Sequence, residues 1–113
     1  MIFECRVSNI TPLRVPKVHR VKSTCGEVEI EVELHEDAVK VPSRDSRITI
    51  EITSSKEECI KHYFCGHGYV VSNTLIGDVY RVVISLHGFL VVVKSKNRLE
   101  LNELDRVYVG ATY

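Results

Sequence analysis

The side chains with the most obvious chemistry lie in the middle of the chain, at Cys59, His62, Cys65 and His67. Thiolates and imidazoles are the ligands of structural zinc sites, so these four residues could in principle surround a tetrahedral ion. Such sites usually contain a Cys-x2-Cys or Cys-x4-Cys pair, and neither spacing occurs here. We therefore expect no metal and no cofactor. Cys65 and Tyr69 would instead pack beneath a glycine-kinked loop, with Cys59 and His62 in ordinary loop positions.

A cysteine nucleophile paired with a histidine would be the catalytic use of the same segment. The candidate pair is Cys65 with His67 or His87. Such a pair needs surroundings that favour the thiolate and a third group that orients the histidine. The sequence indicates neither, and no nucleophile motif surrounds Cys65. We therefore expect no catalytic residue in this chain.

Two glycines flank His67, and a glycine-rich segment can also bind phosphate. Gly66 and Gly68 do not fit that use, because no Lys followed by Ser or Thr comes after them and no helix is expected to start there. Glycine is also favoured where the backbone has a positive φ or where another segment approaches closely. We expect one of these two reasons at each position.

The composition predicts the class of fold that positions these residues. The 113 residues include 18 valines and 9 isoleucines but only 2 alanines. Side chains branched at Cβ suit the pleated surface of a sheet and lose rotamer freedom on a helix. A chain of this length can form one domain with its own hydrophobic core. We therefore expect a single all-β domain over residues 1–113.

Charge and hydropathy limit the function and the compartment. The chain has 15 basic and 15 acidic residues, whereas proteins that bind nucleic acid on their own usually carry a basic excess. Residues 1–6 lack the pattern of a signal peptide, and the longest apolar run, 89–93, is too short to span a bilayer. We therefore expect a cytoplasmic protein whose four cysteines are reduced thiols.

Alternating apolar and charged residues predict the strands in the first half of the chain. Residues 26–34 have an apolar face and an acidic face, formed by Val28, Ile30, Val32 and Leu34 on one side and Glu27, Glu29, Glu31 and Glu33 on the other. This is the pattern of a half-buried strand. The preceding segment 18–23 should form a hairpin with it, placing Arg20 and Lys22 opposite the glutamates. Residues 46–53 repeat the alternation with isoleucines inward, after a connection at 36–45.

The second half of the chain predicts a further group of strands. A second β unit should begin near Tyr69 and continue as three strands, at 79–86, 89–94 and 106–112, with a turn at His87-Gly88. Overlapping capping-box patterns favour a short helical turn at 55–62, and residues 99–104 fit either a strand or a turn. Seven or eight short strands with regular turns are typical of a small barrel or sandwich.

Three segments, taken in order, resemble a known family. They are Phe64-Cys65-Gly66-His67-Gly68-Tyr69, Ile84-Ser85-Leu86-His87-Gly88-Phe89-Leu90 and Asp105-Arg106-Val107-Tyr108. In this order and spacing they resemble the archaeal RNA polymerase subunit 8 family, whose members are also called the G subunit, and, more loosely, the eukaryotic subunit 8. The resemblance extends upstream through Arg20-Val21 and Cys25, and covers the chain from about Val18 to its end. The short segment ahead of the final strand is similar to the archaeal form.

The resemblance implies both a fold and a role. Members of the family form a small antiparallel barrel of the oligonucleotide/oligosaccharide-binding (OB) type. This chain would then be a non-catalytic subunit of an archaeal multisubunit DNA-directed RNA polymerase. It would dock on the largest subunit and support the assembly and stability of the enzyme. The alternative is a stand-alone OB-type module for single-stranded nucleic acid. It is disfavoured by the net charge and by the few aromatic residues on the strands.

The hairpin at 84–94 is the candidate partner surface, because both of its faces are apolar. A free-standing barrel has no need of an apolar outer face, so an exposed one indicates a protein partner. The competing interpretation is a strand that its own chain buries on both sides. Tyr108 is a possible further anchor. The predicted interface residues are Leu86, Phe89, Leu90, Val91, Val92 and Tyr108.

Overall fold

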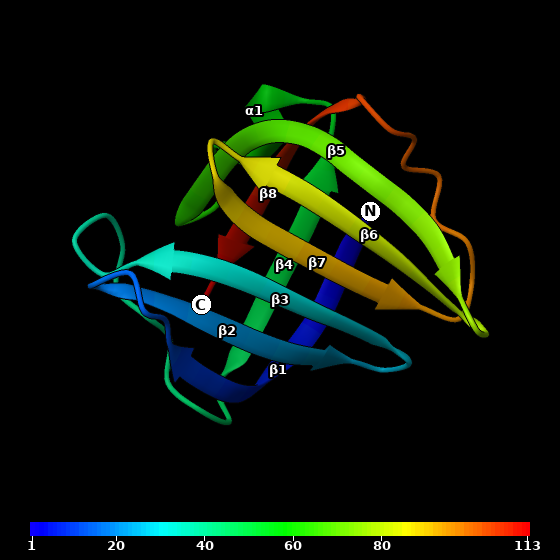
Figure 1. Cartoon of the computed structure of the whole chain (residues 1–113). Coiled ribbons are helices and arrows are strands. Elements are labelled where there is room, and N and C mark those ends of the chain that lie inside the picture. Colours follow the sequence, from blue (N-terminus) through cyan, green and yellow to red (C-terminus); the bar gives the residue numbers. More distant parts are fainter.

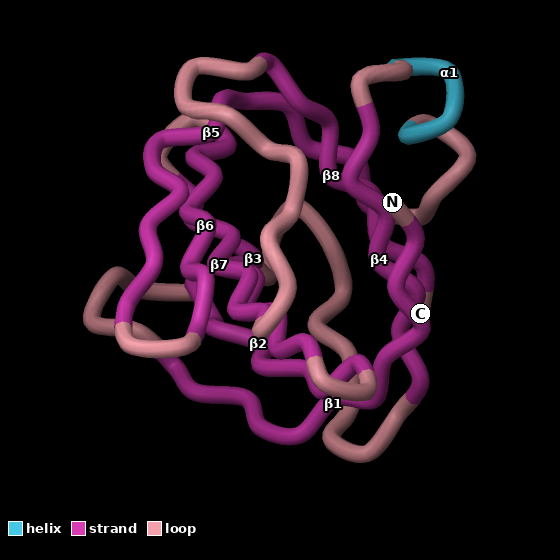
Figure 2. The backbone as a smooth tube through the Cα atoms, turned by 90° about the vertical axis from the view of Figure 1, so that its right-hand side faces the viewer, coloured by secondary structure: helices cyan, strands magenta, loops and turns pink.

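Eight antiparallel strands close into a barrel, as Figures 1 and 2 show for the computed structural model, which describes residues 1–113. The strands are β1 (Ile2–Pro12), β2 (Val18–Cys25), β3 (Val28–His35), β4 (Arg47–Thr53), β5 (Phe64–Ile76), β6 (Val79–Leu86), β7 (Phe89–Ser95) and β8 (Arg106–Thr112). Their order around the barrel is β1-β2-β3-β7-β6-β5-β8-β4, and β4 pairs back with β1. The prediction of a small antiparallel barrel of seven or eight strands is confirmed, and the closed sheet is compatible with the OB type.

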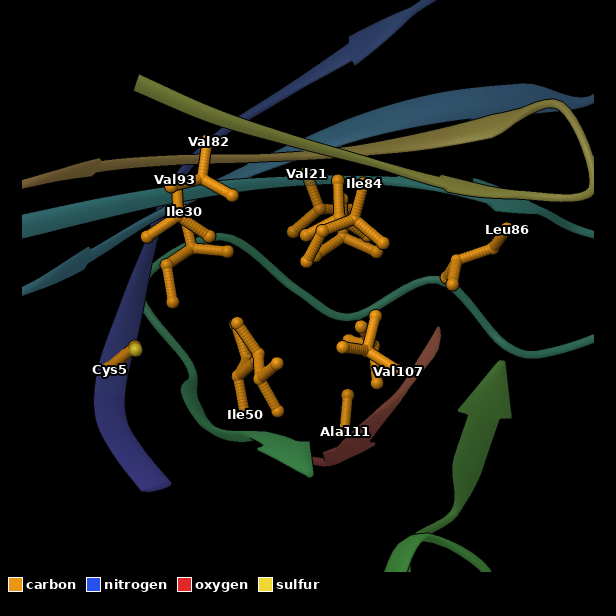
Figure 3. Packing of buried hydrophobic residues seen from close by; sticks show 14 of the residues in the cluster. Cys5, Val21, Ile30, Ile50, Val82, Ile84, Leu86, Val93, Val107 and Ala111 are labelled. Carbon is orange, nitrogen blue, oxygen red and sulfur yellow. The ribbon is translucent and has the colours of Figure 1, made fainter. Parts of the chain in front are cut away.

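The barrel interior is filled by the β-branched residues that alternation placed inward. Ile30, Ile50 and Ile84 are fully buried, and Figure 3 shows them among the packed side chains of the core. Removing such side chains from water stabilises the fold by about 1.5–3 kcal/mol each. The predicted inward faces of 26–34 and 46–53 are therefore confirmed.

The first strand closes the barrel, and the sequence pattern did not predict it. β1 pairs with β2 along one edge and with β4 along the other. Its alternate residues Cys5 and Val7 are buried in the core, and the register shifts between Val7 and Asn9. The exposed residues of this strand include both apolar and polar side chains, so apolar and polar residues do not alternate clearly along it.

The outer surface of the β2–β3 hairpin is the charge ladder that the sequence predicts. Arg20 pairs with Glu33 at 3.1 Å, and Lys22 lies 3.9 Å from Glu29. In the strand register, Arg20 is directly opposite Glu33 and Lys22 is opposite Glu31. These cations are therefore engaged by acidic neighbours on the same sheet.

The expectation of reduced thiols is wrong for all four cysteines, which form the disulfides Cys5–Cys25 and Cys59–Cys65. The β1–β2 register places the first pair face to face, with Cα atoms 4.2 Å apart. The expectation was based on compartment alone. Disulfides are rare in most cytosolic proteins but common inside hyperthermophilic archaea and bacteria.

The connection between β4 and β5 contains the helix of this structure. The predicted helical turn is confirmed as α1 (Lys56–Cys59), in which the Glu58 N–H donates to Oγ of the N-cap residue Ser55. It lies outside the ring of strands against β4 and β8 (Figure 2).

Residues 99–104 form no strand, although Leu101 is buried in the core. No helix in the structure has the length and apolar character needed to cross a membrane.

The connection at 36–45 is fastened at Lys40 by two tyrosines. The Lys40 N–H donates to the Tyr63 hydroxyl at 2.9 Å, and the Tyr113 hydroxyl donates to the Lys40 carbonyl. The two rings meet edge to face with centroids 5.2 Å apart. Partial burial, with a smaller contribution from the nearby Tyr63, raises the pKa of Tyr113 to about 12.

Candidate functional site

Two of the predicted interface residues lie in the core and are therefore no part of a surface. Val91 is fully buried opposite Ile84, and Leu86 is 5% exposed. Side chains along a strand alternate between the two faces, so the inward set of the hairpin is Ile84, Leu86, Val91 and Val93, together with the partly buried Phe89. This corrects the predicted interface, which included residues from both faces of the hairpin.

The outward face of the same hairpin is only partly open. Leu90 is 36% exposed, whereas Val92 is 7% exposed although it lies outside the core cluster. Val92 stands opposite Val83 on β6 and Glu31 on β3. The chain therefore buries Val92 on its outer face as well, as the competing interpretation expected. Leu90 remains as the apolar residue that this face presents.

Beside the hairpin, three rings on the outer surface of β5 and β8 meet the ring of His87 from the β6–β7 turn. The centroid of the His67 ring lies 4.9 Å from that of Tyr108, 5.7 Å from His87 and 6.1 Å from Tyr69. Arg106 covers Tyr69 at 5.8 Å and donates to its hydroxyl at 3.2 Å. That hydrogen bond raises the pKa of Arg106. We call Tyr69, His67, His87 and Tyr108 the ring cluster.

Strand pairing explains why these rings meet. In the β5–β8 register His67 lies opposite Tyr108 and Tyr69 opposite Arg106. The strand β5 begins at Phe64 rather than near Tyr69 as predicted, so residues 64–69 pair with β8 and do not form a kinked loop. Tyr69 is accordingly 44% exposed and not packed beneath that segment.

The two glycines of β5 permit a close approach of β6, which confirms one of the two reasons we expected for them. A Cβ at Gly68 would lie 1.7 Å from the Ser85 carbonyl oxygen, and one at Gly66 would lie 2.7 Å from Cδ1 of Leu86. Neither glycine has a positive φ, whereas His87 and Gly88 in the β6–β7 turn both do. The glycines thereby let β5 lie against the end of β6 that carries His87.

A small apolar pocket opens next to the ring cluster. Its volume is about 120 Å³, and it lies between the end of β3, the following turn, the start of β5 and the β6–β7 turn. Figure 1 shows the β6–β7 turn beside the start of β5. Most of the lining is apolar: Leu34, Ala38, Val39, Phe64, Leu86 and Phe89. His67 also lines the pocket, and its Nε2 is buried without a hydrogen-bond partner.

The cysteine and histidine cluster is not brought together as a metal site. Cys59 is bonded to Cys65, which also removes the thiol of the proposed nucleophile. His62 instead joins β4 to β8, with Nε2 2.8 Å from Oε1 of Glu51 and Nδ1 2.7 Å from Oγ1 of Thr112. No group of three or more His, Cys, Asp or Glu side chains converges as metal ligands would.

Sequence reasoning missed part of this region. The sequence shows His67 between two glycines, and that arrangement could have indicated a side chain placed where strands come close. Ala38 and Val39 carry no such signal, because they belong to a connection and reach the pocket only through the fold.

Comparison with known proteins identifies relatives over nearly the whole chain. A family model described as the G subunit of DNA-directed RNA polymerase matches residues 1–112. DNA-directed RNA polymerase subunit Rpo8 of Sulfolobus acidocaldarius is 30% identical over 110 residues, which are 92% of this chain and 90% of that protein. A solved structure of the cytoplasmic molybdate-binding protein ModG covers 99% of this chain and 89% of its own, with a TM-score of 0.40 and 11% identity. A likeness of that size supports no conclusion about ligand or role.

Proposed function

The chain belongs to the family of the G subunit of DNA-directed RNA polymerase, and we propose that it docks on the largest subunit of the polymerase and supports assembly of the enzyme. As a family member it is a subunit of a multisubunit RNA polymerase. The match of the family model to residues 1–112 is the observation that carries the proposal. We further propose that the chain contributes no catalytic residue and works in the cytoplasm with the rest of the complex.

The proposed docking surface joins the exposed edge of the β6–β7 hairpin to the ring cluster. Leu90 supplies apolar contact, and Tyr108 supplies a ring with a polar end. Tyrosine and arginine are enriched at the centres of protein interfaces, and Arg106 lies beside Tyr69 here. Of the residues that the sequence indicated, Leu90 and Tyr108 remain in this surface. Val92 shares the outer face of Leu90 but is buried, and Phe89 packs against the core on the other face of β7.

The test of docking is a Leu90→Glu variant of the full chain. The tagged chain is expressed in cells that contain the rest of the polymerase, and the complex is purified through the tag. Cross-linking followed by mass spectrometry identifies the subunit it contacts. We expect the wild-type chain to cross-link to the largest subunit and Leu90→Glu to be folded but to recover at least about tenfold less polymerase.

Thr11→Glu is the matched control, because Thr11 is an exposed residue on the outer face of β1, opposite Arg20. It adds the same charge away from the proposed surface and should recover polymerase as the wild type does. A folded Leu90→Glu variant that assembles normally contradicts the docking surface. Cross-links confined to another subunit contradict the proposed partner.

The second candidate, a module for single-stranded nucleic acid, is favoured by the neighbouring rings and Arg106 on one outer face. The zero net charge and the pairing of Arg20 and Lys22 with glutamates oppose it. We expect the purified chain to bind a labelled single strand with a Kd weaker than about 10 μM at physiological salt. Submicromolar affinity in a fluorescence titration would favour the second candidate.

A further inference from the structure

The apolar pocket beside the ring cluster has the size of a single side chain. A cavity of 150 Å³ lined by aliphatic and aromatic residues is known to hold one benzene molecule. At about 120 Å³, this pocket is smaller and matches a branched aliphatic side chain better than an aromatic ring. Its lining from Leu34, Phe64 and Leu86 offers dispersion contacts but no charge.

One polar atom in this region lacks a partner. The Nε2 of His67 is buried and makes no hydrogen bond, and buried polar groups in folded proteins are nearly always satisfied. The atom is closed to solvent, so a docked peptide group does not reach it unless the surrounding rings move. The wall that a ligand meets in the pocket is therefore mainly apolar, and an aliphatic side chain fits it without a hydrogen bond to His67.

The rim of the pocket argues for an uncharged ligand. Glu33 lines it, but that carboxylate already accepts from the Leu90 N–H at 2.8 Å and pairs with Arg20 at 3.1 Å. His35 is also occupied, because its Nδ1 accepts from the Asp37 N–H. The remaining rim group, His87, belongs to the ring cluster. The pocket is thus continuous with the proposed docking surface through His67 and His87.

We propose that this pocket accepts one branched aliphatic side chain of the polymerase subunit on which the chain docks. The inference deepens the proposed function and rests on it. Leucine, isoleucine or valine fits this description, and a Phe or Trp side chain exceeds the volume.

The main experiment fills the pocket from its rim. Ala38 is exposed and lines the pocket, so Ala38→Phe places a ring at the opening without altering the core. Polymerase that lacks this subunit is titrated with the labelled full chain, and the Kd is measured by fluorescence anisotropy. We expect Ala38→Phe to weaken binding at least about tenfold.

Ser43→Phe is the matched control, because it adds the same ring to an exposed position of the same connection outside the pocket. It should bind within about twofold of the wild type, as expected for a change that touches neither partner. Wild-type chain that fails to bind the depleted polymerase contradicts the proposed function itself. Wild-type chain that binds, together with a folded Ala38→Phe that binds equally well, overturns the pocket alone.

A second measurement keeps the inference testable if Ala38→Phe does not fold. The wild-type chain is titrated with N-acetyl-leucine methylamide, and the methyl resonances of Leu34 and Leu86 and the His67 ring nitrogens are followed by NMR. N-acetyl-alanine methylamide and N-acetyl-phenylalanine methylamide serve as smaller and larger controls. Saturable shifts with the leucine probe, and none with the other two, support the pocket. No shift with the leucine probe, or the same shifts with all three, overturns it.

Discussion

The outer faces of the β2–β3 hairpin and of the β5–β8 region belong to the same barrel but carry different kinds of side chain. On β2–β3 the outward positions carry opposite charges, with Arg20 paired to Glu33 across the strands. On β5–β8 the outward positions carry rings, with His67 at the centre of the ring cluster. The charged face pairs Arg20 with Glu33 within the chain, whereas the ring-bearing face presents aromatic rings and Leu90 is exposed nearby. The proposed docking surface uses the second face and not the first.

The largest expected effect separates the two faces of the β6–β7 hairpin. Val91→Glu places an unpaired carboxylate in the core, where Val91 is fully buried, and should reduce the free energy of unfolding by about 5 kcal/mol. That loss approaches the whole stability of a small domain, so we expect no cooperative thermal transition by circular dichroism. Leu90→Glu, one residue away, should melt within a few degrees of the wild type. A cooperative, wild-type melt for Val91→Glu would contradict the inward assignment.

The same residues show how far the sequence could predict the fold and the site. Alternation alone placed Ile30 and Ile50 inward, because a strand face has a period of two. Alternation could not predict whether Leu90 or Val91 faces water, since both are apolar and only the register decides it. The sequence could not predict the pocket either. Ala38 and His67 are distant in sequence, and only the closed barrel brings them together.

The disulfides show a different limit of sequence reasoning. Pairing of Cys5 with Cys25 depends on the β1–β2 register, and the strand β1 was not predicted. The expected compartment then favoured reduced thiols. A correct assignment of β1 would have placed these two cysteines opposite each other.

Glycine substitutions sharpen the comparison between the two faces. Gly68→Ala on β5 should cost about 3 kcal/mol in the free energy of unfolding, because its Cβ would lie 1.7 Å from the Ser85 carbonyl oxygen. Gly26→Ala in the β2–β3 turn meets no atom within 4 Å, and only its φ of +64° is unfavourable. It should cost about 1–2 kcal/mol. Urea unfolding of both variants gives the order, and an equal or reversed order would contradict the close approach of β5 and β6.

A smaller effect concerns Tyr113, whose hydroxyl is hydrogen-bonded to the connection that follows β3. Tyr113→Phe loses the hydrogen bond to the Lys40 carbonyl and should reduce the free energy of unfolding at pH 7 by about 1 kcal/mol. The fold raises the pKa of Tyr113 from 10.0 to about 12. Its contribution is therefore fully present below pH 10 and is lost as the pH rises towards 12.

The difference between wild type and Tyr113→Phe should accordingly narrow between pH 10 and pH 12. Urea unfolding of both proteins across this range measures it, with Tyr80→Phe as a control for general effects of tyrosine removal. A difference that stays constant with pH would show that the Tyr113 hydroxyl titrates alike in the folded and unfolded chain.

The smallest expected effect tests whether the charged face contributes to stability at all. Lys22 and Glu29 lie 3.9 Å apart, with side chains 41% and 44% exposed, so water and salt screen their attraction. Lys22→Ala should change the free energy of unfolding by no more than about 0.5 kcal/mol, and by less at 1 M salt. It should also leave recovery of the polymerase unchanged, because Lys22 lies on β2, two strands away from Leu90 on β7 and outside the proposed docking surface. A Lys22→Ala variant that keeps its stability but loses the polymerase would move the docking surface to the charged hairpin, and the contrast between the two faces would have to be reversed.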